Sequence, residues 1–294
     1  MLLKPDCIPC ILKMSASAIR NLTDDEGVLK DLTIRILQIP ALQGREWNIP
    51  SPEVIKGVMT VINEAFKTND PFQGLKAEQN RKGLELYPTL KQMVKASADP
   101  LFTAAKMAVM GNFIDLMISD RSIEPAKTLE QDLNSLSISE RVFQGFKEKL
   151  QKANLLLYIG DNSGEVVFDK VLLETIKEVM DTEIVFAVRG EPALNDVTMK
   201  EAKQVGLDDL VRLVDNGQKE PVPGTMLANC SDEFRRLFHQ ADLVVSKGGG
   251  NFDTLDEEKD HTANITFMLL AKCHPYCQYF QTQMYQPIMA NVFH

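Results

Sequence analysis

Short apolar runs separated by helical patterns dominate the second half of this 294-residue chain. The runs at 155–159, 184–188, 211–214 and 243–245 have the length of buried strands. Strands that alternate with helices form a parallel sheet with right-handed crossovers. A further apolar stretch at 265–271 fits a fifth strand or a buried helix. We therefore predict an α/β fold, a Rossmann-like doubly wound α/β/α sandwich over residues 151–294.

Residues 1–150 contain helices and loops, and we predict that they form an all-helical N-terminal domain. Ser51-Pro52 and Asp99-Pro100 each place a capping side chain before a proline at the first helical position. Pro88 should kink or end the helix between these two starts. A last helix is predicted from about Ser139, with apolar residues at helical spacing behind it.

Composition excludes several classes of protein. A formal net charge of -9 argues against a nucleic-acid partner. No apolar run approaches the roughly 20 residues of a membrane span, and the N-terminus lacks a signal-peptide stretch. Five cysteines, an odd number, do not suggest a secreted disulfide framework. We expect a cytoplasmic protein with no membrane partner, and a homo-oligomer is compatible with the sequence.

Polar, glycine-bearing segments follow three of the predicted strands. In a doubly wound sheet, ligands bind at the carboxyl ends of the strands, near the point where strand order reverses. If the first and fourth strands flank that point, residues 161–162 and 246–251 face one another. The second strand leads into residues 189–196. We expect these three segments to converge on one crevice.

The residue types in this crevice predict a metal and a phosphate in one site. The strand–turn–helix at 155–165 is typical of an anion cradle, yet Asp161 lies at its mouth, and a carboxylate repels phosphate unless a cation lies between them. Oxygen ligands from Asp161, Asn162 and Asp196 suit Mg²⁺ or Mn²⁺. Lys247 would neutralise phosphate charge. The glycines at 248–250 indicate close backbone approach to another group.

Other interpretations remain open at this stage. Asp-Asn-Ser-Gly and Asn-Asp are common turn sequences. A dinucleotide site is disfavoured because no G-x-G-x-x-G is present, and a P-loop because Lys247 precedes its glycines. An S-adenosylmethionine-dependent methyltransferase would use a similar sheet, although Lys247 argues against a cationic ligand. A non-catalytic phosphometabolite-binding protein on the same fold is the other alternative.

Segments 160–165, 189–198 and 241–255 occur in an order that resembles the metal-dependent damage-control phosphatases, formerly a domain-of-unknown-function family. The Cys7-Ile8-Pro9-Cys10 motif resembles the stand-alone microbial branch. The resemblance covers nearly the whole chain. It implies a helical domain packed on a Rossmann-like domain. It also implies a phosphomonoesterase that uses Mn²⁺, Co²⁺, Ni²⁺ or Mg²⁺ to hydrolyse sugar phosphates or damaged phosphometabolites.

The resemblance also assigns roles to individual residues. Those roles are metal binding by Asp161, Asn162 and Asp196, phosphate binding by Lys247, and lining of the site by Glu165, Arg189, Asn251, Asn112 and Asp115. Asn112 and Asp115 would close the site from the helical domain, with a buried polar pair as the alternative. The catalytic residues would be Asp161 and Lys247, and the nucleophile either metal-activated water or Asp161 itself. Two features depart from the family pattern: Asp253 in place of glutamate, and the tail after Cys277.

Four cysteines form two spaced pairs, Cys7 with Cys10 and Cys273 with Cys277. Such spacing suits a structural zinc site if the two ends of the chain meet. Inert thiols are the alternative. None of the four histidines lies in a recognisable ligand pair, so we expect them to be structural.

Overall fold

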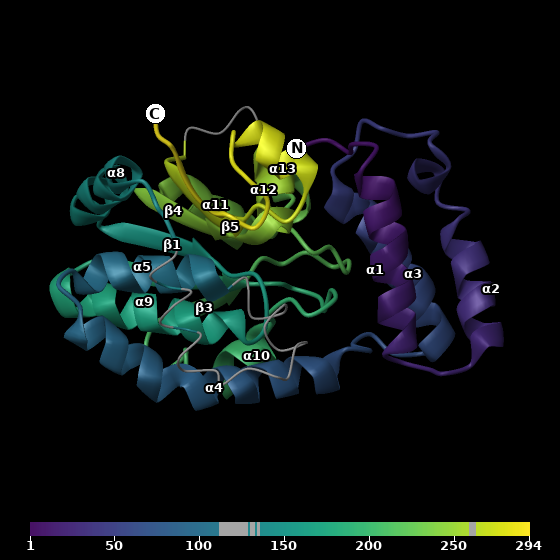
Figure 1. The fold of residues 1–294 in the computed structure, drawn as a ribbon, viewed down its shortest axis with the longest axis horizontal. Coiled ribbons are helices and arrows are strands. Elements are labelled where there is room, and N and C mark those ends of the chain that lie inside the picture. The colour runs from purple at the N-terminus through teal and green to yellow at the C-terminus, as the bar shows by residue number, and fades with distance from the viewer. Residues whose placement is uncertain (112–128, 130–132, 134–135, 259–262) are drawn as a thin grey trace.

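A computed structural model of the chain describes residues 1–111, 129, 133, 136–258 and 263–294, and its centre is a six-stranded sheet (Figure 1). The strands are β1 (Leu155–Ile159), β2 (Glu183–Val188), β3 (Arg212–Asp215), β4 (Leu243–Lys247), β5 (Ile265–Leu270) and β6 (Pro287–Val292). Their order is β3-β2-β1-β4-β5-β6. This order confirms the predicted Rossmann-like fold, with β1 and β4 flanking the switch point.

The register brings the ends of the central strands to one level. Ile159 of β1 is paired with Ala187 of β2 and with Ser246 of β4. The stretch at 265–271 is a strand, β5, parallel to β4. β6, which lies in the tail whose role the sequence left open, pairs antiparallel with β5. Mixed sheets commonly carry such an antiparallel edge strand.

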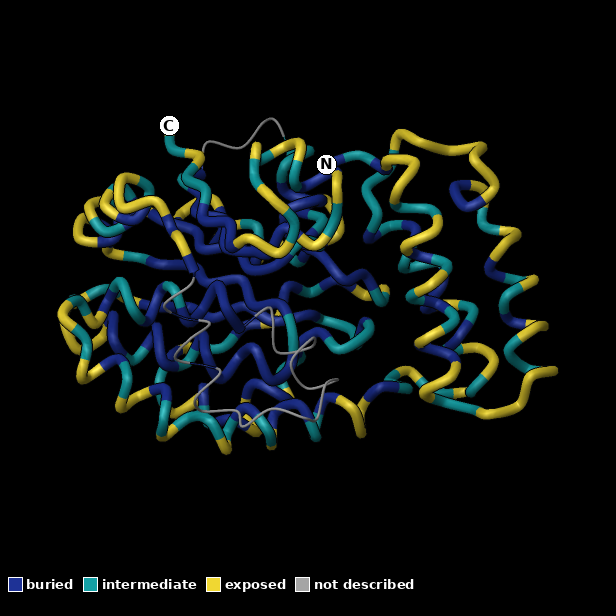
Figure 2. The backbone as a smooth tube through the Cα atoms, viewed as in Figure 1, coloured by how far each residue is buried: buried dark blue, intermediate teal, exposed yellow. Residues whose placement is uncertain are grey.

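Helices cover both faces of the sheet (Figure 1). One face carries α4 (Gln73–Ala96), α5 (Pro100–Met110), α8 (Glu140–Gln151), α9 (Glu165–Val179) and α10 (Met199–Gln204); the other carries α11 (Asp232–Gln240), α12 (Gly248–Leu255) and α13 (His274–Tyr279). A hydrophobic core lies on each face of the sheet. Side chains of β1 enter the two cores in alternation, because neighbouring strand residues point to opposite faces. Leu156 and Tyr158 join the first core, and Leu157 and Ile159 the second. All four are buried, and Figure 2 shows the central strands of the sheet as mostly buried.

The N-terminal helices form a bundle with its own hydrophobic core. It comprises α1 (Cys7–Arg20), α2 (Glu26–Ile36), a short 3₁₀ turn (Pro40–Gln43) and α3 (Ser51–Phe66), with core residues from Leu3 to Phe72. By contrast, α4, α5 and α8 share a core with the sheet. The boundary near residue 150 stays a prediction, while the packing favours a division near residue 72.

The predicted helix starts agree with the structure to within a residue. Asp99 caps α5 by accepting from the backbone N–H of Phe102 at 3.0 Å. At α3, Pro50 holds the cap position and Ser51 is the first helical residue. Pro88 does not end its helix, because α4 continues from Gln73 to Ala96 through it. An interior proline removes one backbone hydrogen bond, and tertiary packing of Leu90 and Val94 retains the helix beyond it.

The bundle docks near the strand ends that were predicted to carry the site. Ser51 Oγ donates to Asp253 Oδ2 at 2.6 Å, and Lys56 Nζ lies 3.2 Å from Glu220 Oε2. Leu194, in the loop after β2, packs against the bundle core. Figure 1 shows the loops that follow the strands extending towards α1 and α3. None of the described helices combines the length and apolarity required to cross a bilayer.

Candidate active site at the switch point

The loops after β1 and β2 lie side by side and bring the three predicted metal ligands together. Asn162 and Asp196 form an isolated antiparallel bridge, and the backbone N–H of Val197 donates to the carbonyl of Asp161 at 2.8 Å. Both carboxyl side chains are buried, with 7% of Asp161 and 3% of Asp196 exposed. Since these contacts start directly at the strand ends, the sheet itself sets the spacing of the ligands.

Arg189 lies between the two carboxylates. Its Nε donates to Asp196 Oδ2 at 2.6 Å, and its Nη2 lies 3.4 Å from Asp161 Oδ1. Nη1 donates to Asn251 Oδ1 at 2.7 Å and to Thr225 Oγ1 at 3.2 Å. The guanidinium is therefore held on three sides, and the structure brings the predicted residues Arg189 and Asn251 into the site.

The three glycines at the start of α12 permit three close approaches. A Cβ on Gly248 would lie 1.8 Å from Asp161 Oδ2, and Gly248 has a φ of 77°. A Cβ on Gly249 would lie 2.4 Å from the Tyr276 hydroxyl, and one on Gly250 would lie 1.9 Å from the Pro223 carbonyl. A Cβ at Gly248 or Gly249 would displace the Asp161 or Tyr276 side chain, and one at Gly250 would require the backbone to move. The close approach expected from the sequence is present, and one of its targets is the candidate metal ligand Asp161.

Lys247 occupies a position different from that of a phosphate ligand. Its ammonium is fully buried and donates to Glu165 Oε1 at 2.6 Å, Asp169 Oδ1 at 2.6 Å and the Ala108 carbonyl at 2.7 Å. An ammonium has three N–H donors, so protein groups use all of them. This arrangement does not support the predicted phosphate contact. The sequence analysis did not foresee the direction of this side chain. Lys247 ends β4, and its side chain points towards α5 and α9.

Glu165 connects Lys247 to the metal-ligand turn. Glu165 Oε2 accepts from Asn162 Nδ2 at 3.1 Å, while Asp161 Oδ2 accepts from the same nitrogen at 2.8 Å. These two bonds fix the amide, so that its nitrogen faces carboxylates and its oxygen points elsewhere. Glu165 therefore orients Asn162, and the structure gives no direct evidence that it touches a substrate.

The charges of this cluster fit a divalent cation. Four buried carboxylates, Asp161, Glu165, Asp169 and Asp196, contact two buried cations, Arg189 and Lys247, so acidic groups outnumber the basic groups in contact with them. Burial raises the pKa of Asp161 well above its usual value, and the nearby charges of Asp196 and Glu165 raise it further. Burial likewise raises the pKa of Asp196, against the opposing effect of Arg189. A cation placed among these oxygens would relieve the repulsion.

The donor set also fits such a cation. Within the described ranges, no three Cys, His, Asp or Glu side chains converge closely enough to hold a metal. The predicted set contains only two carboxylates, with the amide of Asn162 as its third member, and oxygen ligands of this kind suit hard divalent cations. Ser163 Oγ in the same turn is buried without a hydrogen-bond partner among the residues that the structure describes. The chemistry of the loop is therefore compatible with a bound metal.

Two groups near the site were missed by the sequence analysis. Lys272 lies two residues after the end of β5, is exposed, and its positive charge opposes the raised pKa of Asp161. Because the sequence left 265–271 as either a strand or a helix, it did not show that Lys272 lies at the same edge of the sheet as the candidate site. The other group is a set of buried polar residues on α4. Because most residues of this helix are polar, its sequence does not show which of them are buried. Asn112 and Asp115 lie outside the described residues.

One cysteine near the C-terminus, Cys273, lies within electrostatic reach of the N-terminal pair. Burial raises the pKa of Cys273 to about 11, and charges of Cys7 and Cys10 also act on it. All five cysteines are free thiols. The structural zinc site gains no support, because no cluster of three metal-ligating side chains occurs in the described part of the chain.

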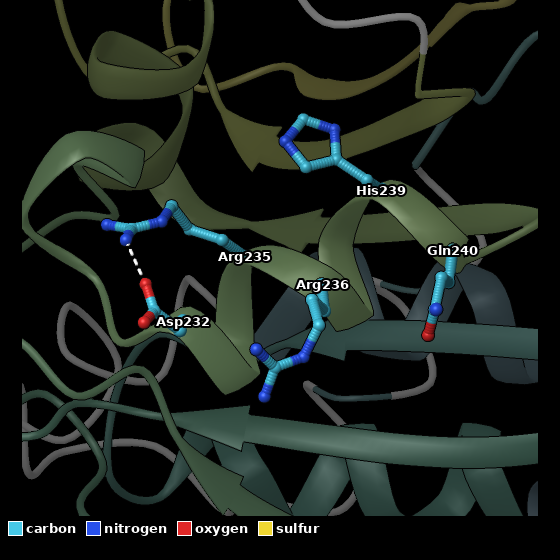
Figure 3. Close-up of a pocket in the computed structure, with 5 residues that line it drawn as sticks. All are labelled: Asp232, Arg235, Arg236, His239 and Gln240. Carbon is cyan, nitrogen blue, oxygen red and sulfur yellow. Dashed lines mark hydrogen bonds and ion pairs between the residues drawn. The ribbon is translucent and has the colours of Figure 1, made fainter.

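A shallow surface hollow of about 370 Å³ lies elsewhere, along α11 (Figure 3). It is lined by Asp232, Arg235, Arg236, His239 and Gln240. Arg235 is paired with Asp232. None of the predicted site residues lines it, so this hollow has no part in the candidate active site.

The protein is a doubly wound α/β protein with acidic and amide side chains at the switch point, the place where proteins of this class bind their ligands. Residues 3–287 match the damage-control phosphatase ARMT1-like domain, and the chain belongs to this family. Family membership supports a phosphatase role, and hence a hydrolase.

Relatives from archaea extend over almost the whole chain. A damage-control phosphatase of Pyrococcus horikoshii is 30% identical over 275 residues, covering 91% of this chain and 90% of the relative. One from Archaeoglobus fulgidus is 28% identical over 286 residues, covering 94% of each chain. An uncharacterised protein of Methanocaldococcus jannaschii is 31% identical over 283 residues, covering 93% of this chain and 90% of its own.

A solved structure confirms the architecture. The crystal structure of a DUF89 family protein from Pyrococcus horikoshii superimposes with a TM-score of 0.82 and 26% identity, covering 98% of both chains. The family and fold expected from the sequence are therefore confirmed.

Proposed function

We propose that this protein is a metal-dependent phosphomonoesterase that hydrolyses small phosphorylated metabolites, sugar phosphates or damaged phosphometabolites. The observation that carries the proposal is the convergence of Asp161, Asn162 and Asp196 at the switch point, within a cluster of four buried carboxylates and two buried cations. Relatives named damage-control phosphatases support the same reaction class.

In this proposal Asp161, Asn162 and Asp196 hold a divalent cation, with Mn²⁺, Co²⁺, Ni²⁺ and Mg²⁺ as the candidates. A bound cation would polarise a phosphoryl oxygen and lower the pKa of a bound water. Arg189, held by Asn251 and Thr225, reduces the repulsion between the two carboxylates that it contacts and supplies positive charge beside the phosphate. Glu165 and Lys247 keep the Asn162 amide in a single orientation.

We assign the phosphate-binding positive charge to Lys272. Its side chain is exposed and makes no ion pair with any described residue, whereas the ammonium of Lys247 is saturated. Lys272 lies in the loop between β5 and α13, and Tyr276 of that helix packs on Gly249. Because Gly248 contacts Asp161, this loop borders the metal ligands. A flexible lysine there can neutralise phosphate charge that develops during the reaction.

The nucleophile is either a water molecule or Asp161, which would form an aspartyl-phosphate. The stereochemical course at phosphorus, followed with a phosphate ester made chiral by oxygen isotopes, distinguishes the two, because two successive in-line displacements through an aspartyl-phosphate retain the configuration. A single in-line attack by water inverts it.

A panel of phosphate esters tests the function. Sugar phosphates, nucleotides and p-nitrophenyl phosphate are incubated with the metal-free protein, alone or with each of Mn²⁺, Co²⁺, Ni²⁺ and Mg²⁺. The proposal predicts phosphate release only in the presence of metal. Tight binding without release would instead support a phosphometabolite-binding protein. Methyl transfer from S-adenosylmethionine without phosphate release would support a methyltransferase.

A further inference from the structure

A buried polar face of α4 contacts both loops that carry the candidate metal ligands. Lys76 and Asn80 are fully buried and Gln79 is 6% exposed. Residues spaced three or four apart lie on one side of a helix, so the three side chains share a face with Gly83. Burying polar groups costs free energy unless they find partners. The contacts of these three side chains therefore indicate the role of this face of α4.

Asn80 holds the turn after β1. Its Oδ1 accepts from the backbone N–H of Gly164 at 2.7 Å, and its Nδ2 donates to the Glu201 carbonyl at 3.1 Å. Gly164 precedes α9 with a φ of 77°, so its N–H belongs to a tight turn that begins with Asp161 and Asn162. A Cβ on Gly83 would lie 2.9 Å from the Gly164 carbonyl. The helix backbone is thus pressed directly against the turn.

The same face holds the loop after β2. Gln79 Oε1 accepts from Asn195 Nδ2 at 3.3 Å, one residue before Asp196. Lys76 Nζ lies 3.2 Å from Glu201 Oε2 and 2.8 Å from Asp70 Oδ2. Glu201 in turn forms a capping box with Thr198 at the start of α10. One helix face therefore contacts the chain on both sides of Asp196.

We infer that Lys76, Gln79 and Asn80 are positioning residues that set the spacing between Asp161–Asn162 and Asp196, and thereby the affinity of the site for its cation. The inference rests on the proposed function, because it assigns these residues a role towards the metal. Residues that orient metal ligands without touching the metal typically change metal affinity 10- to 100-fold when they are lost.

The test is the dissociation constant for Mn²⁺, measured by isothermal titration calorimetry on the metal-free, full-length protein. Asn80→Ala should weaken Mn²⁺ binding by about 10- to 100-fold, and Gln79→Ala should weaken it less. Val94→Ala is the matched control, because Val94 is buried on the same helix and packs in the core. It should lower the Tm and leave the Mn²⁺ dissociation constant unchanged.

The outcomes separate this inference from the proposed function. If wild type binds Mn²⁺ and both Asn80→Ala and Gln79→Ala bind it within twofold of wild type, the inference is overturned and the proposed function stands. If Asn80→Ala does not fold, unchanged binding by Gln79→Ala overturns the inference in the same way. A wild type that neither binds Mn²⁺ nor releases phosphate would overturn both.

Discussion

Lys247 donates to Glu165 across 2.6 Å inside the protein, at the end of the strand that was expected to present this lysine to phosphate. Glu165 also accepts a hydrogen bond from the side-chain amide of Asn162 at 3.1 Å. The pair therefore links the core of the protein to a candidate metal ligand. Lys247 and Glu165, two of the predicted site residues, therefore orient Asn162. This role does not require either of them to contact the substrate.

Lys247→Met should destabilise the protein. It leaves Glu165 and Asp169 buried without their cation, and breaking a buried ion pair costs roughly 3–5 kcal/mol. Thermal and urea unfolding of the metal-free protein measure the loss. A lysine whose role is to bind phosphate would give the opposite pattern, a raised KM with unchanged stability.

Gly248→Ala should remove metal binding and activity together. The new Cβ would lie 1.8 Å from Asp161 Oδ2, and the φ of 77° is strained for alanine. Gly74→Ala is the control, because no atom lies within 4 Å of a Cβ there. It should be neutral or stabilise α4 by up to about 1 kcal/mol. Normal Mn²⁺ binding by Gly248→Ala would contradict the close contact with Asp161.

Lys272→Met should raise KM for phosphate esters and the inhibition constant of inorganic phosphate. A charge-assisted hydrogen bond contributes about 1.5–3 kcal/mol, or roughly 10- to 100-fold. Because Lys272 is exposed, the Tm should stay at its wild-type value. Lys95→Met, at the exposed far end of α4, should change none of these quantities. An unchanged KM in Lys272→Met would show that another group binds the phosphate.

Asp253 should make folding stability depend on pH. Burial raises its pKa from 3.8 to about 6, although hydrogen bonds from Ser51 and Tyr276 oppose the shift. The folded state therefore holds a proton that the unfolded chain releases, so the stabilisation is complete below about pH 4 and lost as pH rises through 6. The difference amounts to roughly 3 kcal/mol.

Asp253→Asn removes this titration. Relative to wild type, its free energy of unfolding should rise between pH 4 and pH 7, as measured by urea unfolding at each pH. Ser51→Ala should enlarge the pH dependence, because the hydrogen bond that holds the pKa down is lost. A constant difference between wild type and Asp253→Asn would show that Asp253 does not titrate in this range.

Local sequence patterns predicted the strands, the switch point and the convergence of Asp161, Asn162 and Asp196, because strand exits follow directly from apolar runs and sheet order. The direction of Lys247 was beyond their reach, since it depends on the carbonyl of Ala108 and on carboxylates of α9. Strand β6 was missed because its pairing with β5 is tertiary. The polar face of α4 was missed for the same reason: burial of Asn80 depends on a turn 84 residues away.

The central claim is that Asp161 helps to hold a cation without which phosphate is not released. Phosphate release from the best ester of the panel, measured across a Mn²⁺ titration for wild type and Asp161→Asn, tests it most directly. The account predicts that wild-type activity rises from zero as Mn²⁺ is added, and that Asp161→Asn stays at the metal-free level throughout. Full activity of Asp161→Asn, or wild-type activity without metal, would contradict it.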